Sequence, residues 1–315
     1  MTLRGSRFWA LMSLFLIALP FALPSDYYLG IATHALVLAI LALSLDILIG
    51  QGGMTSLGHA VYLGLPAYAA AWTMQNANWP PELAIPFAIA MGTAVSALFA
   101  VLSLRARGLG FLMITLALGQ VMWGAAYRWV GLTGGDNGIR IPVRPPVLGI
   151  DISSVRSFYV VVALALMVAL VCIWHLERSP FGACLRGTKD QPKRMNMLGH
   201  DVWSIRFLAF VFAGFWGSIA GVLYVFDYLY VSPSSLSLPQ SAEALLMVVL
   251  GGAGTLTGPV VGAIIITVIK TVVSSYVDRW YSLLGLTFII VVSVMPRGLV
   301  PGLKAWFAPK EGGAR

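Results

Sequence analysis

Long apolar runs separated by short polar or turn-rich stretches recur along almost the whole chain. Most of them approach the ~20 residues that an α-helix needs to cross a bilayer. They predict ten helices, at residues 8–24, 27–49, 58–75, 84–104, 110–131, 157–176, 206–230, 241–252, 259–277 and 281–296. The pattern therefore predicts an all-α, polytopic membrane protein with about ten transmembrane helices.

Two of these runs are unlike the others. Run 58–75 opens in a glycine-rich stretch, and run 241–252 is too short to cross a bilayer alone unless it is tilted or re-entrant. A seven-residue pattern, G-x-x-T-x-x-G, interrupts apolar sequence at both places, over 52–58 and 252–258. We expect two glycine-broken segments there.

Paired glycine-broken segments in the two halves of a membrane protein point to a substrate path, because unwound backbone is tolerated only where it lines a cavity or is buried in protein. Helix packing through small residues explains the same pattern equally well. On the first interpretation, the predicted path residues are Gly52, Gly53, Thr55, Ser56, Gly58, Gly252, Gly254, Thr255, Thr257 and Gly258.

Composition supports the membrane class. Hydrophobic residues make up 59% of the 315 positions and charged residues only 10%, with a mean hydropathy of +0.86; a soluble domain has roughly 25% charged residues. Residues 1–315 are therefore predicted to form a single transmembrane domain whose first helix is retained. The net charge of +8 lies in short loops, which excludes a nucleic-acid-binding face.

The basic residues are distributed unevenly between the loops. Residues 177–206 form the one large polar loop, which carries six Lys or Arg. With both termini in the cytoplasm, ten spans place fourteen of the 20 Lys and Arg inside, which agrees with the positive-inside rule. Lys270 lies within a span, and five arginines fall outside: Arg128, Arg140, Arg144, Arg156 and Arg279.

Sequence motifs of enzymes are missing. The chain has no H-E-x-x-H and no G-x-G-x-x-G, and its four histidines are too far apart to indicate a metal site. Residues 182–189 have the G-x-x-x-x-G spacing of a phosphate loop, but the final Lys and Thr are reversed and a membrane helix precedes them. Cys172 and Cys184 support neither a disulfide nor a metal site. We expect no catalytic residues, no metal and no cofactor.

Four ionisable residues fall within the predicted spans: Asp46, Asp227, Glu243 and Lys270. Burying a charge in hydrocarbon costs a few kcal/mol or more, so such residues often mark ion pathways. A self-sufficient secondary transporter that uses Asp46 or Glu243 as an ion relay is therefore an alternative function. The other explanation is that the three acids are hydrated or paired near span ends and that Lys270 snorkels toward an interface.

The large loop, residues 177–206, also contains Leu185, Met195, Met197 and Leu198 among its charges. This composition is typical of a short helix that binds in a groove of another protein. Ser179-Pro180 is expected to start a turn, and Gly199 to stop the amphipathic piece that ends near Leu198. The loop is therefore predicted to be a cytoplasmic docking surface.

Several blocks of sequence, in order from about Leu36 to Leu303, carry a family resemblance. They include GQGGMTSLGHAVYLGLPAYAAA, LTGGDNGI, SPFGACLRGTKDQPKRMNMLGHDVWSIRFLAFVFAG and SAEALLMVVLGGAGTLTGPVVGA. The chain resembles the inner-membrane permease subunits of branched-chain amino acid ABC importers, and the LTGGDNGI block favours the LivM-like member of the pair. The resemblance implies a non-enzymatic pore subunit in the bacterial inner membrane, which moves a branched-chain amino acid or a related small amide solute inward.

The same resemblance implies partners and a coupling motif. The partners are a second homologous permease, two cytoplasmic ATPase subunits and an extracytoplasmic substrate-binding protein. In the family, the loop after the sixth span supplies an ATPase-coupling helix, whose positions here correspond to Arg186, Gly187, Asp190 and Gly199. The chain departs from the usual motif with Asp for Glu, Gly for Ala and a proline at Pro192, so the helix is expected to start at Pro192 or to be split.

Overall fold

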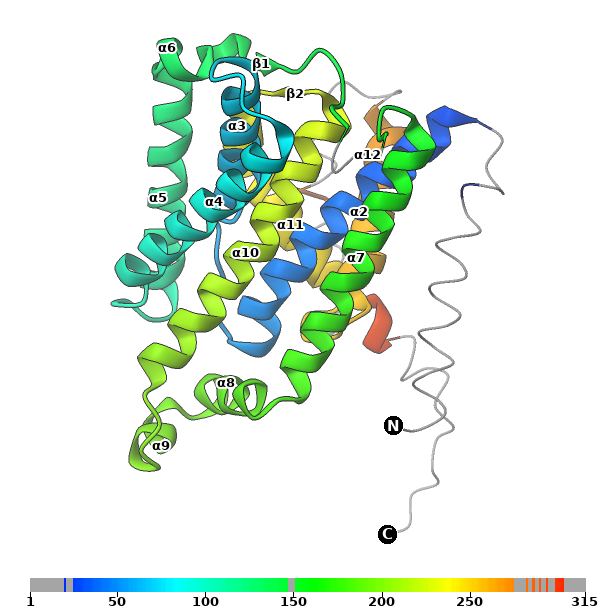
Figure 1. Cartoon of the computed structure of the whole chain (residues 1–315). Helices are drawn as coiled ribbons and strands as arrows, with labels where there is room; N and C mark the ends of the chain where they lie inside the picture. Colours follow the sequence, from blue (N-terminus) through cyan, green and yellow to red (C-terminus); the bar gives the residue numbers. More distant parts are fainter. Residues whose placement is uncertain are drawn as a thin grey trace.

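The structure is a computed structural model that describes residues 25–146 and 151–274, together with Pro20, Ser282, Gly285, Leu286, Ile289, Ser293 and 298–302. The predicted helices 8–24 and 281–296 lie outside the two continuous ranges. In the part of the chain that is described, the fold is a bundle of helices (Figure 1).

The helices and strands follow one another in a simple order. The long helices are α2 (Asp26–Asp46), α4 (Pro81–Ser103), α5 (Leu109–Arg128), α7 (Val155–Arg178) and α10 (Val202–Tyr228). Shorter helices are α3 (Val61–Gln75), α6 (Val130–Thr133), α8 (Pro180–Asp190), α9 (Pro192–Met197), α11 (Leu238–Gly251) and α12 (Gly258–Ser274). Single turns are the π-helix η1 (Ile47–Gln51) and the 3₁₀-helices η2 (Gly135–Asn137) and η3 (Pro233–Leu236); the strands are β1 (Ile139–Arg140) and β2 (Tyr230–Val231).

Five helices within the described ranges are long and apolar enough to cross a membrane: α2 with η1, α4, α5, α7 and α10. The all-α membrane class is therefore confirmed, whereas the count of ten spans stays a prediction. The only sheet in these ranges is the two-residue antiparallel pair of β1 and β2, which ties the loop after α6 to the end of α10.

Helix α2 is the centre of the bundle and packs against α7, α10, α11 and α12 (Figure 1). Its residues from Ala35 to Asp46 are all buried. A helix that is apolar on all sides is typical of a buried position. By contrast, α4 and α5 leave most of their surface exposed in this single chain, where lipid or another subunit can cover it.

Both predicted glycine breaks are confirmed as interruptions of helix. Residues 53–60 are non-helical between η1 and α3, so the predicted helix 58–75 begins three residues late, at Val61. A Cβ added to Gly58 would lie 2.3 Å from the carbonyl oxygen of Thr115 in α5, so a close approach of backbones holds this segment. Residues 252–257 form the second break, between α11 and α12.

The described loops fall at two ends of the bundle (Figure 1). One end carries α8 and α9, and we call it the α8 end. The other carries α6, β1 and β2, and we call it the β1–β2 end. The predicted threading assigns the α8 end to the cytoplasm.

Candidate functional site

Helices α8 and α9 divide the large basic loop into two pieces. The hydroxyl of Ser179 caps α8 by accepting a hydrogen bond from the backbone N–H of Gly182 at 3.1 Å. Gln191 then leaves the helical conformation (φ −145°, ψ 80°), as a residue before proline tends to do, and Pro192 starts α9. Gly199, with φ +83°, follows the end of α9. The amphipathic piece expected to run through about Leu198 is therefore split, and proline is the cause.

The four predicted coupling residues lie on different faces of these two helices. Asp190 and Gly199 are exposed at the α8 end. Gly187 faces α9 instead, because an added Cβ would lie 2.7 Å from the sulfur of Met195. Arg186 turns toward the bundle, as described below. A larger residue at position 187 would have to displace the flexible side chain of Met195.

The first glycine break is in direct contact with α8. The ammonium of Lys189 donates a hydrogen bond of 2.8 Å to the carbonyl oxygen of Gly50, in the π-helical turn η1. The stem of Lys189 lies against Gly53, where an added Cβ would be 2.7 Å from Lys189 Cγ. Gly53 also has φ +65°, which favours glycine. The basic loop and the break are therefore one contact surface.

A second set of polar contacts joins the same elements. The guanidinium of Arg186 donates to the side-chain oxygen of Gln51 at 3.2 Å and to the carbonyl oxygen of Glu177 at 2.8 Å. The amide nitrogen of Gln51 donates to the Glu177 carboxylate at 2.9 Å. The end of α7, the start of the break and α8 are therefore linked by side chains.

The two glycine breaks meet each other beside this surface. The carboxylate of Asp46 accepts a hydrogen bond of 2.8 Å from the backbone N–H of Gly254. A Cβ added to Gly50 would lie only 2.4 Å from the nitrogen of Gly254, so no larger residue fits there without a shift. Two segments about 200 residues apart in sequence are thus brought together.

The predicted path residues differ in their exposure. Gly53 and Gly254 are exposed, and Thr55, Thr255 and Thr257 are half-buried. The remaining five are buried: Gly52, Ser56, Gly58, Gly252 and Gly258. Gly53 and Thr55 line a cavity of about 280 Å³ at the α8 end, whose wall also includes Arg107 and Arg206.

Deeper in the bundle, the backbone donors of the first break are bound by hydroxyl groups. The N–H of Leu57 donates to Thr115 in α5 at 3.3 Å, and the N–H of Ala60 donates to Ser241 in α11 at 3.0 Å. In the second break, the Thr255 hydroxyl accepts from the N–H of Gly258 at 3.1 Å. These groups are satisfied within the protein, as unwound backbone in a membrane must be.

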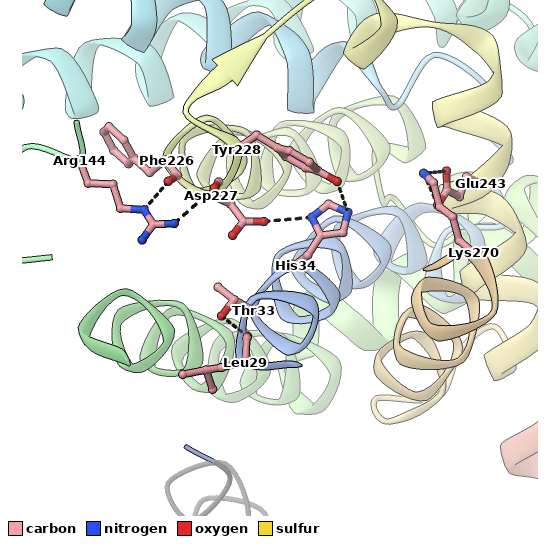
Figure 2. Close-up of polar contacts among 9 residues, drawn as sticks. All are labelled: Leu29, Thr33, His34, Arg144, Phe226, Asp227, Tyr228, Glu243 and Lys270. Atoms are coloured by element: carbon pink, nitrogen blue, oxygen red, sulfur yellow. Dashed lines mark hydrogen bonds and ion pairs between the residues drawn. The ribbon is translucent and has the colours of Figure 1, made fainter. Parts of the chain in front are cut away.

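The acids predicted within spans have partners. Glu243 is 2% exposed and forms an ion pair of 2.9 Å with Lys270. Asp227 lies 3.1 Å from the Nδ1 atom of His34. Figure 2 shows both pairs. The paired explanation therefore holds for Glu243 and Asp227. Asp46 is buried and accepts a backbone N–H instead. The half-buried charge of Lys270 is explained by its ion pair with Glu243.

Sequence reasoning missed three residues of this surface: Lys189, Gln51 and Glu177. In the sequence, Lys189 stands out as a loop cation and as the last residue of the phosphate-loop-like stretch, but its partner is a backbone carbonyl that no side-chain pattern marks. Gln51 carried a usable signal, because it is the polar residue inside the first glycine run. Within the described ranges, no group of three His, Cys, Asp or Glu side chains could hold a metal ion.

Comparison with known proteins adds an independent finding. Residues 27–294 match the family described as the branched-chain amino acid transport system permease component. The chain is 25% identical, over its full length and 79% of the relative, to the high-affinity branched-chain amino acid transport system permease protein LivM of Escherichia coli K12. It is 27% identical, over 88% of its length and 81% of the relative, to the autoinducer 2 import system permease protein LsrC of Enterobacter sp. strain 638. No solved structure matches the chain.

Proposed function

The chain belongs to the permease-component family of branched-chain amino acid transport systems, and from this premise we propose that it is the membrane-spanning subunit of an ATP-binding-cassette importer. It moves a branched-chain amino acid, or a related small amino acid or amide solute, inward across a bacterial inner membrane. ATP is hydrolysed by two separate cytoplasmic subunits. A second homologous permease and an extracytoplasmic binding protein complete the assembly.

The observation that carries this proposal is the hydrogen bond from Lys189 to the carbonyl oxygen of Gly50. This hydrogen bond connects α8, which an ATPase subunit would bind, to the first glycine break, which a solute would pass. On this proposal, Asp190 and Gly199 lie on the exposed surface that faces the ATPase. Arg186 and Gly187 hold α8 against the bundle and against α9.

The contacts provide a route from ATP hydrolysis to the membrane segments. When an ATPase subunit displaces α8, the Lys189 ammonium leaves Gly50, and the π-helical turn loses a partner. Because Gly50 also touches Gly254 and the neighbouring Asp46 binds the N–H of that residue, the displacement reaches both breaks. Opening and closing of the α8 end of the path are then linked to one movable helix.

The chemistry of the breaks suits an amino acid. Its ammonium and carboxylate can be matched by exposed carbonyls and by helix N-termini along the breaks. Gly53 and Gly254 are the exposed glycines, and Thr55, Thr255 and Thr257 add neutral hydroxyls beside them. In this structure, the Lys189 ammonium donates a hydrogen bond to the carbonyl oxygen of Gly50. A backbone carbonyl of this kind could also accept a hydrogen bond from the ammonium of a solute.

The first prediction tests the Lys189 contact. In proteoliposomes with the sister permease, both ATPases and the binding protein, Lys189→Met is expected to lower ATP-driven uptake of labelled leucine at least about ten-fold. The reason is that it removes a charge-assisted hydrogen bond worth about 1.5–3 kcal/mol. The ATPase subunits should still co-purify, since their proposed surface is intact.

Arg105→Met is the matched control. Arg105 is exposed in the loop between α4 and α5, outside the predicted docking surface, and makes no hydrogen bond to the described residues. Its uptake should stay within two-fold of the unmodified assembly, by the usual near-neutrality of surface changes. Equal uptake in the two variants would contradict the coupling role of Lys189.

The same vesicles separate the importer from the secondary transporter considered above. Uptake should require ATP trapped with the ATPase subunits and should persist when ionophores remove the sodium and proton gradients. Uptake that follows an ion gradient without ATP would show that the chain is a secondary transporter. Competition by unlabelled valine, autoinducer 2 and urea would then rank the solutes, since relatives of this chain are named for different ones.

A further inference from the structure

A second polar cavity lies at the β1–β2 end, away from α8. It has a volume of about 350 Å³ and is bordered by α2, α7, α10, α12 and the loop after β1. Arg144 and Asp227 contribute opposite charges to its wall, Thr267 a hydroxyl, and Val155 and Phe158 apolar surface. Figure 2 shows Arg144 and Asp227 side by side in this region. The volume falls within the range of small-molecule sites.

Arg144 is held in place without a carboxylate partner. Its Nε donates to the carbonyl oxygen of Phe226 at 2.7 Å and its Nη2 to that of Asp227 at 3.3 Å, while Nη1 reaches Ser153 O only at 3.5 Å. The guanidinium lies over the ring of Phe158, 4.5 Å from the centroid. Among the described residues it forms no ion pair. Burial lowers the pKa of Arg144, opposed by the charge of Asp227.

A guanidinium fixed in this way is suited to receive a carboxylate. Its five N–H groups form a planar fork that matches the two oxygens of a carboxylate, and the contacts above leave part of that fork free. Because the group always carries its charge, and because only backbone carbonyls accept its hydrogen bonds, the half-buried Arg144 can still bind a carboxylate directly. An anionic group entering the cavity would complete it.

The opposite charge is supplied by Asp227. One carboxylate oxygen, Oδ2, faces the Nδ1 atom of His34 at 3.1 Å, and the other ring nitrogen of His34 meets the hydroxyl of Tyr228 at 3.1 Å. The second oxygen, Oδ1, makes no hydrogen bond to the residues that the structure describes. It is an available acceptor for a cation such as an ammonium.

Thr267 provides an independent sign that something is bound here. Its side chain is 1% exposed, and its hydroxyl finds no hydrogen-bond partner in the described part of the chain. Valine would fill the same space without this unsatisfied group, which costs stability when it is buried. The hydroxyl is therefore available to a group that enters the cavity, in whose wall Thr267 lies.

We propose that this cavity binds the charged head of a free α-amino acid, with the carboxylate on Arg144, the ammonium on Asp227 and the Thr267 hydroxyl as a further hydrogen-bonding group. The aliphatic side chain lies against Ile31 and Val155. The inference rests on the proposed function and deepens it. It gives the permease an amino-acid subsite at the end opposite α8, where a binding protein would deliver its solute.

The test is direct binding of tritiated leucine, without binding protein, to the assembled importer in nanodiscs that contain phosphatidylglycerol and phosphatidylcholine. Arg144→Gln and Thr267→Val are each expected to weaken binding at least about ten-fold, since each removes a buried hydrogen-bonding partner of the ligand. Arg140→Gln is the matched control. Arg140 is exposed in β1, stacks on Tyr230 and is outside the cavity, so binding should stay unchanged.

Thr267→Val distinguishes a loss of ligand binding from a loss of protein stability. Because the hydroxyl has no partner in the protein, this change should leave the melting temperature equal or higher while binding falls. A ligand comparison identifies the group on Arg144: isoamylamine, which lacks the carboxylate of leucine, should bind the unmodified importer at least about ten-fold more weakly. In Arg144→Gln, leucine and isoamylamine should bind with about equal affinity.

Three outcomes would overturn the proposal. One is leucine binding that is unchanged in Arg144→Gln and Thr267→Val while ATP-driven uptake by the unmodified importer is normal, in which case the proposed function stands and the subsite is wrong. Another is absence of both binding and uptake in the unmodified importer, in which case both are wrong. The third is co-purified phosphatidylethanolamine that disappears in Arg144→Gln while leucine binding does not change, which would assign the cavity to a lipid head group.

Discussion

Gly50 lies where the backbones of two membrane segments almost touch. It contributes its carbonyl oxygen to Lys189 on one side and faces the nitrogen and Cα of Gly254 on the other. The same position is also close to the carboxylate of Asp46. At the scale of single residues, the proposed function therefore depends on glycine at position 50, because a side chain there would push the two breaks apart.

This gives a prediction for Gly50→Ala. An added methyl group would lie 2.4 Å from the Gly254 nitrogen, so we expect the two breaks to separate and the assembly to lose about 1–3 kcal/mol of stability, as overpacked sites do. Thermal unfolding of the purified importer and its leucine uptake measure the effect, and both should fall.

Gly124→Ala is the control for that change. Gly124 lies within the long helix α5, outside both polar cavities, and an added Cβ would meet nothing within 4 Å. Because alanine favours helix by up to about 1 kcal/mol, this variant should be equally or more stable. A melting temperature lowered by the same amount in both variants would show that the Gly50–Gly254 approach is not special.

At the scale of elements, α8 is a short helix that depends on its ends. Its eleven residues are too few for a stable isolated helix. It is held by the Ser179 cap, by Leu185 in the core and by Arg206 of α10, which donates to the carbonyl oxygen of Thr188 at 2.7 Å. A short helix held by these few contacts can move as one unit when a bound partner changes conformation.

Removing the cap tests this dependence. Ser179→Ala should destabilise α8 by about 1 kcal/mol, because the N–H of Gly182 loses its acceptor. Amide hydrogen exchange in α8 should become roughly five-fold faster if exchange follows local opening. ATP-driven uptake should fall with it, while assembly is retained.

Ser154→Ala is the matched change at the β1–β2 end. Ser154 caps α7 and accepts from the N–H of Ser157 at the same distance, 3.1 Å. It should accelerate exchange in the first turn of α7 and leave exchange in α8 unchanged. If Ser154→Ala also accelerated exchange in α8, a general loss of stability, and not loss of the Ser179 cap, would explain the effect.

At the scale of the whole molecule, the two ends of the bundle differ in charge and in content. The α8 end carries the large basic loop, and the predicted threading assigns it to the cytoplasm on the positive-inside rule. The β1–β2 end carries the loops that a binding protein would meet. The direction of transport depends on this orientation.

Single-cysteine labelling tests the orientation. After Cys172 and Cys184 are replaced by serine, Asn76→Cys should react with a membrane-impermeant maleimide added outside intact cells. Asn196→Cys, exposed on α9, should react only after the membrane is opened. The reverse pattern would invert the threading and would place α8 away from any cytoplasmic ATPase.

Much of the architecture could be predicted because it depends on local chemistry. Apolar runs identified α2, α4, α5, α7 and α10, since hydrocarbon accepts only long apolar helices whose backbone is internally paired. Glycine spacing identified the two breaks, and proline identified the split between α8 and α9. Boundaries were less accurate where a neighbour decides them, as at Gly58, whose helix start is set by contact with α5.

The sequence by itself determined the membrane class, the helix interruptions and the family, because hydropathy, glycine and proline act through the chain's own backbone and its solvent. Only the tertiary structure decided which groups meet. Lys189 binds a backbone carbonyl, Asp46 binds a backbone N–H and Arg144 caps the end of α10 through two carbonyls. Backbone groups are the same at every position, so no residue pattern identifies the one that a side chain will reach. That choice depends on helix packing, which brings distant parts of the chain within hydrogen-bonding distance.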